Sequence, residues 1–283
     1  MSNKDNFDQA DDPDFWAEIE SIAGLIKSQT KATYTTVTND IRQSGLPNID
    51  TVIQLVSPSI CLKTKKGNAK VGQSKLGGMP DLPTDISFPL DKNGQPYIFL
   101  GQINLSEFKK WSKNFALSSG LLYFFIQFGK DLTAKERCKI IYTQSADNLA
   151  TCELPTGYKE ENVFKATKLK SHIGYYLPKT DSREVNQFAY STDLLEKYEQ
   201  LFTKLSDYFG TEATHRLFGY PYQIQGDLRN DWSSDNYELL FQICCGYENY
   251  NDRFGEAIIY FGVDKQDLLK ATFDNAVWTM QMT

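Results

Sequence analysis

The stretch SKLGGMPDLPTDISFPL, Ser74–Leu90, holds two glycines and three prolines around a single lysine, Lys75. Met79 precedes a proline and is therefore pushed into extended backbone, whereas Gly78 can adopt a positive φ at little cost. A chain that turns at a glycine and leaves through a proline enters the next strand at a sharp angle. The stretch therefore predicts a structural corner, in preference to a loop that grips a ligand.

A second corner of the same pattern lies in the C-terminal half. KLGGMP (75–80) and RLFGYP (216–221) share the order basic–Leu–x–Gly–x–Pro and start 141 residues apart. Two more matches follow in the same order, at offsets of 140 and 137 residues, and they pair Gln102–Ile103 with Gln242–Ile243 and Tyr123 with Tyr260. One short match is expected by chance, but three in the same order are not. The sequence therefore predicts an internal duplication.

Strand patterns dominate the chain, and helical patterns lie between them. Apolar runs predict strands over 95–105, 120–128, 139–144, 173–177, 237–245, 257–263 and 276–282, and a strand pair over 51–63 that breaks at Pro58. Helical spacing and caps predict helices over 12–29, 106–115 (capped by Ser106), 192–210 and 264–272. Because strands and helices do not alternate regularly, we expect an α+β fold with mainly antiparallel sheets and flanking helices.

The domain organisation follows from these patterns. No linker or low-complexity segment divides the chain, so we expect a disordered tail over residues 1–12 and a single domain over 13–283. Within that domain, the predicted duplication relates two pseudo-symmetric halves, about 70–128 and 211–263.

Composition and charge argue against several classes of protein. The chain has 283 residues, a formal net charge of −6 and a sequence pI of about 5.1. Its basic cluster, KTKKGNAK at Lys63–Lys70, is interpreted as an exposed loop, so we expect no nucleic-acid partner. Five cysteines without a CxxC pair are typical of reduced thiols, and the N-terminus lacks a signal-peptide pattern. With no apolar run long enough to span a bilayer, we expect a cytoplasmic protein with no membrane partner.

The familiar catalytic and cofactor motifs are missing from the sequence. It contains neither a glycine-rich phosphate-binding motif nor a GxSxG nucleophile elbow. The two histidines, His172 and His215, lie 43 residues apart and lack the clustered ligands that a metal site needs. We therefore predict no metal, no cofactor and no catalytic residue.

The strongest candidate for a ligand site follows the second corner. A histidine can carry protons near neutral pH, and arginines can hold an anion by two-pronged contacts. If the halves are symmetric, Lys75 and Arg216 flank one cleft. The candidate ligand-binding residues are Lys75, His215, Arg216, Gln225, Asp227 and Arg229. The structural alternative, which we favour, is an ion-pair network in which Asp227 pairs with Arg229 or caps a turn.

The leading functional hypothesis is a non-enzymatic binding protein that recognises a protein partner. The loop GYENYNDRF, Gly246–Phe254, is rich in tyrosine, an efficient interface anchor, and an acidic surface would steer a basic partner. The candidate partner-binding residues are Tyr247, Tyr250 and Phe254. The alternative is a small-anion binder or hydrolase-like enzyme that uses a cleft between the two repeats.

Several of these motifs, in this order, resemble the YwqG-like family, a bacterial domain family of unknown function. The resemblance rests on SKLGGMPDLP, YIFLGQINL, GLLYFF, HRLFGYPYQIQGDLR, LLFQI and FGEAIIYF, and it extends from Ser74 to the C-terminus. It implies an α+β fold and no reaction. The residues that match its signatures are Gly77, Gly78, Pro80, Pro83, His215, Gly219, Tyr220, Pro221, Gln225, Asp227 and Arg229. Relatives usually carry acidic residues after the Gln–Ile, where this chain has Cys244 and Cys245, and this difference argues against a shared metal site there.

Overall fold

The computed structural model describes residues 33–188, 191–209, 215–232, 234–246, 250 and 253–282. The predicted tail and the helix predicted over 12–29 lie outside these residues. The strands are β1 (Ser57–Lys65), β2 (Lys75–Leu76), β3 (Asp81–Pro83), β4 (Ile98–Asn104), β5 (Leu121–Ile126), β6 (Cys138–Thr143), β7 (Leu149–Thr151), β8 (Thr167–Tyr176), β9 (His215–Leu217), β10 (Tyr237–Cys244), β11 (Ile258–Asp264) and β12 (Val277–Gln281). The helices are α2 (Tyr34–Gln43), α3 (Ile49–Gln54), α4 (Arg183–Asn186), α5 (Thr192–Phe209), α6 (Leu228–Trp232) and α7 (Lys265–Lys270), and the 3₁₀ helices are η3 (Leu105–Asn114) and η4 (Glu160–Asn162).

The main sheet has ten strands. Four of them lie on each side of the central pair β1–β8. The strand order is β12-β11-β10-β9-β1-β8-β2-β4-β5-β6, and all neighbours are antiparallel. The short strands β3 and β7 pair separately. The central β1–β8 ladder runs in continuous register from Ser57 opposite Tyr176 to Lys65 opposite Lys168. The predicted α+β fold with a mainly antiparallel sheet is therefore confirmed.

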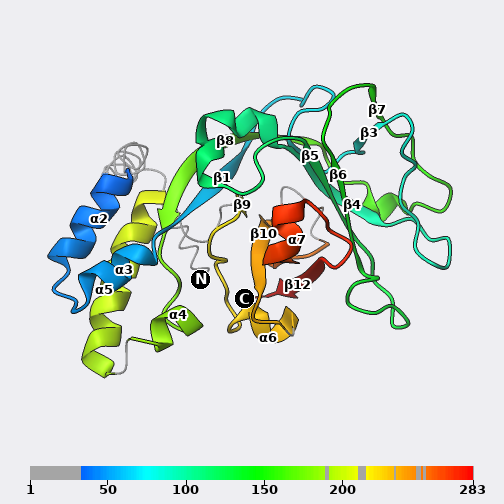
Figure 1. The fold of residues 1–283 in the computed structure, drawn as a ribbon. Helices are drawn as coiled ribbons and strands as arrows, with labels where there is room; N and C mark the ends of the chain where they lie inside the picture. Colours follow the sequence, from blue (N-terminus) through cyan, green and yellow to red (C-terminus); the bar gives the residue numbers. More distant parts are fainter. Residues whose placement is uncertain are drawn as a thin grey trace, which may run out of the picture.

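The sheet is strongly curled, so that the inner faces of its two ends pack against each other (Figure 1). The ring of Phe124 on β5 lies 4.7 Å from that of Phe241 on β10 and 5.0 Å from that of Phe261 on β11, centroid to centroid. The two ends of the sheet are also joined, because Trp278 Nε1 on β12 donates to the carbonyl of Arg137, 2.8 Å away, next to β6. The inner face is therefore one shared apolar core.

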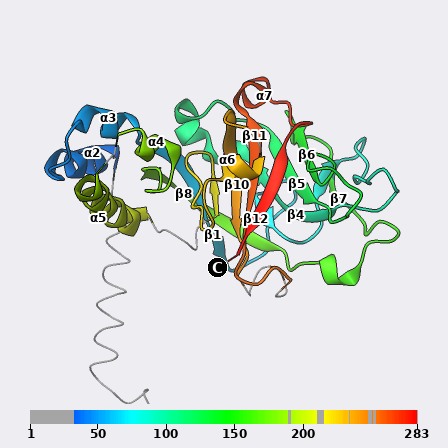
Figure 2. The same ribbon diagram turned by 90° about the horizontal axis from the view of Figure 1, so that it is seen from below.

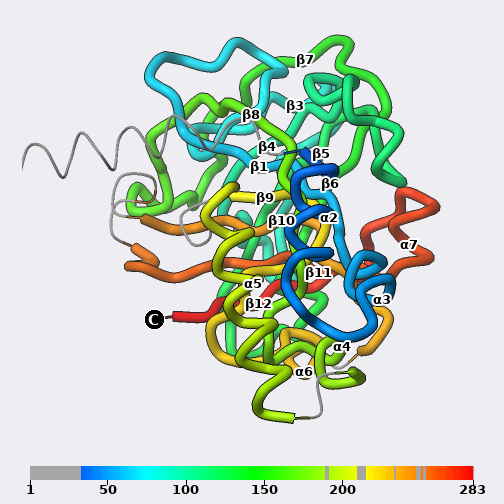
Figure 3. Tube along the Cα trace, turned by 90° about the vertical axis from the view of Figure 1, so that its left-hand side faces the viewer, coloured from blue at the N-terminus to red at the C-terminus, as the bar shows by residue number. Residues whose placement is uncertain are grey.

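Helices and loops cover the outer face in separate patches. The helices α2, α3 and α5 form a layer over one end of the β1–β8 ladder (Figures 1 and 2), and α2 and α5 lie side by side there (Figure 3). This layer buries Val37, Val52 and Tyr198 against Cys61 and Tyr176 of the ladder. The β3–β7 segment covers β4 and β5, and α6 covers β10 and β11.

Most predicted elements are present, and the differences have local causes. The predicted strand pair over 51–63 is wrong: residues 49–54 form α3, because Val52 and its apolar neighbours join the helical layer, and only β1 is a strand. The helix predicted over 106–115 is the 3₁₀ helix η3, and Asn104, not Ser106, caps it by accepting from the Ser106 N–H. The helix α2 was missed in the sequence because only one row of its residues is buried.

Each corner is held by one glutamine and one tyrosine, which we call the Gln–Tyr clamp. At the first corner, Gln102 Oε1 accepts from the N–H of Asp81 at 2.8 Å, and the Tyr123 hydroxyl donates to the Asp81 carbonyl at 2.7 Å. At the second corner, Gln242 Oε1 accepts from the N–H of Tyr222 at 2.7 Å, and the Tyr260 hydroxyl donates to the Tyr222 carbonyl at 2.6 Å. In both cases the clamped residue follows the corner's proline.

The backbone of the two corners also has the same conformation. Gly77 and Gly78 have φ values of 64° and 70°, and Phe218 and Gly219 have values of 61° and 70°. The positive φ predicted for Gly78 and Gly219 is thus confirmed. At Gly77 only glycine fits, because a Cβ would lie 2.4 Å from the Lys165 carbonyl oxygen. Together with the clamps, these turns redirect the backbone after β2 at the first corner and after β9 at the second.

We expect the clamp to contribute measurably to stability. The change Gln242→Leu leaves the partly buried Tyr222 N–H without its acceptor, and an unsatisfied buried donor typically costs about 1–3 kcal/mol in the free energy of unfolding. The matched control Gln43→Leu, at an exposed position of α2, should change it by less than about 0.5 kcal/mol. Urea unfolding followed by circular dichroism measures both. Equal, small effects would show that the clamp has no such role.

Candidate functional site

The two corner cations, expected to flank one cleft, are both buried within the fold. Lys75 is 6% exposed, and its Nζ lies 2.8 Å from Oδ1 of Asp81, which is fully buried. Burial alone would raise the pKa of Asp81, but hydrogen bonds from Lys75, Thr151 and Gly72, with the Lys75 charge, lower it below its usual value. This carboxylate neutralises Lys75, so the lysine charge is not offered to a ligand.

Arg216 occupies the equivalent position at the second corner and makes different contacts. Its guanidinium lies 4.0 Å above the ring of Tyr176, and its Nη1 donates to the carbonyl of Tyr220 at 3.3 Å. The residue is 2% exposed. A stacked and buried guanidinium in these contacts holds two strands and the corner together.

His215 is also a structural residue. It is 3% exposed, and its Nδ1 accepts a hydrogen bond from the backbone N–H of Cys244 at 3.1 Å. Burial lowers its pKa to about 4. The imidazole is therefore neutral at pH 7, with its proton on Nε2, and it is unsuited to carry protons near neutral pH.

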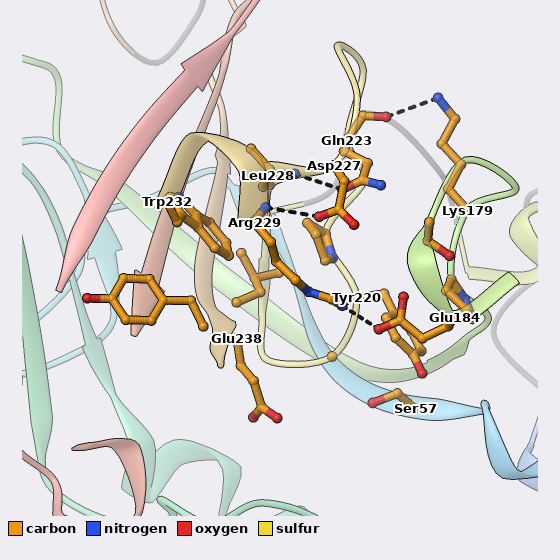
Figure 4. Close-up of a pocket in the computed structure, with 16 residues that line it drawn as sticks. Ser57, Lys179, Glu184, Tyr220, Gln223, Asp227, Leu228, Arg229, Trp232 and Glu238 are labelled. Atoms are coloured by element: carbon orange, nitrogen blue, oxygen red, sulfur yellow. Dashed lines mark hydrogen bonds and ion pairs between the residues drawn. The ribbon is translucent and has the colours of Figure 1, made fainter. Parts of the chain in front are cut away.

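The remaining candidates separate into two places. Asp227 and Arg229 line a cavity of about 230 Å³ between α4, α6, the second corner and the start of β10, which we call the α4–α6 pocket (Figure 4). Gln225 lies outside this lining, and its Nε2 donates to the carbonyl of Met282 at 2.8 Å. The pocket contains the second corner, with Gly219, Tyr220 and Pro221, but not the first.

Two ion pairs join α4 to α6 and to Asp227, the residue just before it. Arg229 on α6 pairs with Glu184 on α4, toward which its side chain extends in Figure 4. In the opposite direction, Arg183 Nε lies 3.4 Å from Asp227 Oδ2. Asp227 Oδ1 also accepts from the Arg229 N–H at 2.9 Å and so caps the start of α6. Of the two roles expected of Asp227 under the structural alternative, the turn cap is present, whereas the ion pair with Arg229 is not: Asp227 pairs with Arg183, and Arg229 with Glu184.

Three polar atoms at this pocket are buried without a hydrogen-bond partner among the described residues. They are Glu184 Oε2, Asp227 Oδ2 and Trp232 Nε1. The Asp227 side chain is 10% exposed, and its ion pair with Arg183 does not have the geometry of a hydrogen bond. A buried acceptor without a donor is costly, so the two carboxylate oxygens mark places where a donor from a ligand would be favourable.

The sequence did not point to Glu184 or Trp232 as site residues. Glu184 lies in a short helix between strands, and Trp232 ends another, so neither belongs to a recognisable motif. They join Asp227 only because α4 and α6 pack beside the second corner. No pattern within a single segment of the sequence encodes this contact.

The expected exposed aromatic loop is not formed by the described residues. Tyr247 lies outside them. Tyr250 and Phe254 are only 1% and 5% exposed, so the prediction that they anchor a partner at the surface is wrong. The Tyr250 hydroxyl donates to the carbonyl of Leu100 at 2.9 Å, and its ring packs on that of Phe164 at 4.9 Å. These aromatic residues instead fill the shared inner core.

The adjacent cysteines Cys244 and Cys245 do not form a thiol pair on one face of the sheet. Cys244 joins the outer cluster under α6 and Cys245 the inner core, so the two thiols point to opposite faces of the sheet. Burial raises the pKa of the Cys245 thiol, which keeps it protonated. In the described ranges, no group of three or more His, Cys, Asp or Glu side chains is placed to hold a metal ion.

The buried neutral His215 predicts a specific dependence of stability on pH. Its folded pKa, about 4, lies below the unfolded value of about 6.5, so the unfolded chain binds a proton first as the pH falls. The contribution of His215 to the free energy of unfolding is fully present above pH ~6.5. It is lost as the pH falls toward ~4, which lowers that free energy by about 3 kcal/mol. In His215→Gln the free energy of unfolding should change less over this range. An unchanged pH profile in that variant would contradict the assignment.

Comparison with known proteins gives a family but no activity. No curated protein matches the chain. Within the part of the chain that the structure describes, no helix is both long and apolar enough to cross a membrane. A family model, the domain of unknown function DUF1963, matches residues 74–281, which include both corners, both clamps and the α4–α6 pocket apart from Ser57. By this match, the chain belongs to the DUF1963 family of domains of unknown function.

Proposed function

We propose that this chain is a non-enzymatic binding protein and that its α4–α6 pocket receives a basic side chain of a protein partner. The observation that carries the proposal is the pair of buried carboxylate oxygens, Glu184 Oε2 and Asp227 Oδ2, that have no hydrogen-bond partner among the described residues. Each carboxylate already pairs with an arginine, so what a ligand would supply is donors for these oxygens, and a guanidinium or ammonium group carries several N–H donors.

The size and walls of the pocket agree with this ligand class. Its volume of about 230 Å³ is below the range of roughly 300–1,000 Å³ that is usual for sites of whole cofactors or drug-sized ligands. It can therefore admit one side chain more readily than a cofactor. Tyr220, Trp232 and Tyr237 line it, and aromatic rings attract cations through their faces.

The charge of the whole chain favours a basic partner as well. A net charge of −6 attracts a positively charged surface and raises its rate of encounter. The small-anion alternative has less support, because Lys75 and Arg216 are buried in contacts of the fold and the pocket does not hold both corners. A hydrolase-like reaction lacks a proton carrier at His215, which is neutral at pH 7.

We also infer that the two halves, about 70–128 and 211–263, arose by duplication. Matching strand orders on either side of the β1–β8 pair, matching corner conformations and matching clamps support this inference. The likeness to the bacterial YwqG-like family is compatible with the DUF1963 match. The five free cysteines support a reducing, cytoplasmic location.

The pocket can be tested with a matched pair of ligands. A blocked glycine–arginine–glycine peptide should bind in isothermal titration calorimetry, and the same peptide with neutral citrulline in place of arginine should not. The double change Glu184→Gln and Asp227→Asn should weaken arginine-peptide binding by roughly tenfold or more, since hydrogen bonds to charged groups contribute about 1.5–3 kcal/mol.

The control is Asp207→Asn on the exposed side of α5, which changes a carboxylate that does not line the pocket. Its affinity for the arginine peptide should equal that of the unchanged protein. Equal binding of the citrulline peptide, or full binding by the double variant, would contradict the proposal. So would the absence of arginine-peptide binding at millimolar concentrations.

A further inference from the structure

Lysines gather on the central strand pair, at the end away from the helical layer. In the β1–β8 register, Lys63 lies opposite Lys170 and Lys65 opposite Lys168. Directly opposed residues of an antiparallel pair point to the same face, and so do residues two apart along one strand. All four side chains therefore share one face, the outer face that carries Cys61 and Tyr176 further along. We call these four residues the lysine ladder.

The lysine ladder breaks a rule of sheet stability. Like charges placed directly opposite each other are destabilising, and here two such pairs follow one another in the longest ladder of the sheet. No ion pair joins these lysines to an acidic side chain within the described ranges. Local rules that a protein breaks without compensation tend to lie at functional sites.

The surroundings of the ladder extend the positive surface. Exposed lysines flank it at Lys66, Lys70 and Lys165. A hollow of about 890 Å³ opens between residues 64–68 and 165–167, next to the ladder. No acidic residue occurs in the sequence from 63 to 80 or from 162 to 180, although the chain as a whole has six more acidic than basic residues. The positive charge is therefore concentrated on one surface of an acidic protein.

We propose that the lysine ladder and its hollow form a docking surface for an extended, acidic segment of a protein partner. Alternate residues of a strand are about 6.7 Å apart, so the ladder offers two parallel rows of ammonium groups at that repeat. An extended peptide with Glu or Asp at every second position presents carboxylates on one side at the same repeat. Such a segment can neutralise both rows, and it relieves the repulsion within each opposed pair.

Other polyanions fit the surface less well. Single-stranded nucleic acid is usually held by aromatic side chains on which bases stack, and the residues that line the hollow include none. A bilayer surface attracts lysines without any requirement for a regular spacing. The regular spacing and the opposed pairs are therefore the features that favour an extended peptide. The proposal is independent of the α4–α6 pocket, which lies beside α6 and the second corner.

Two labelled ten-residue peptides of equal composition test the spacing directly. One alternates glutamate and threonine, and the other places five glutamates before five threonines. Fluorescence anisotropy should show that the alternating peptide binds more tightly, by roughly fivefold or more, and that added NaCl weakens the binding. Equal affinity of the two peptides would overturn the proposal. Tighter binding of a ten-nucleotide oligo-dT, or of phosphatidylserine vesicles, would assign the surface to nucleic acid or lipid and would overturn it as well.

A variant of the ladder separates binding from folding. The double change Lys168→Glu and Lys170→Glu turns both opposed pairs into opposite charges, so the melting temperature should be maintained or rise while binding falls by roughly tenfold or more. The control with the same change of net charge is Lys130→Glu with Lys270→Glu, at exposed positions outside the ladder. It should bind the alternating peptide within about twofold of the unchanged protein. Unaltered binding by the ladder variant, or an equal loss in the control, would contradict the proposal.

Discussion

The backbone N–H and C=O of the residue after each corner proline lie within the fold, buried at Asp81 and partly buried at Tyr222, and their hydrogen-bond partners stand on strands 20 to 42 residues further along the chain. One glutamine and one tyrosine on the next two strands are these partners, and all four of these side chains are fully buried. Each of these side chains places polar atoms in the middle of an otherwise apolar strand, and this costs free energy unless those atoms are hydrogen-bonded. A slip of one residue would turn the glutamine or tyrosine toward the inner core and leave both the side chain and the corner without partners. The clamp therefore sets the register of both halves of the sheet.

The two corners differ at the clamped residue itself, and this difference decides what lies next to them. At the first corner the clamped residue is Asp81. Its carboxylate neutralises Lys75 and accepts a hydrogen bond from the Thr151 hydroxyl at 2.6 Å. At the second corner it is Tyr222, which carries no charge. Arg216 therefore stacks on Tyr176, and the carboxylates near this corner come from α4 and α6. The α4–α6 pocket lies at the corner whose clamped residue carries no charge.

The sequence predicted the features that depend on local or repeated patterns. The run at 121–126 is buried on both faces, as its continuous apolar character indicated, and the positions of the glycines foretold the corner geometry. The expected turn cap by Asp227 is present, but its ion-pair partner is Arg183 instead of Arg229. Tyr250 was misjudged because tyrosine is typical of both interfaces and cores, and only the fold shows that its ring packs on Phe164 and its hydroxyl donates to the carbonyl of Leu100. The lysine ladder was hidden because its two halves lie about 100 residues apart and meet only through the β1–β8 register.

Native-state amide hydrogen exchange tests the role of the clamps most directly. If both clamps close the sheet, the N–H groups of Asp81 and Tyr222 exchange only on global unfolding, with free energies of opening equal to that of the central strands. The account predicts that these two amides, although they lie outside long ladders, are among the slowest in the protein. Rapid exchange of either amide, while the β1–β8 ladder stays protected, would contradict it.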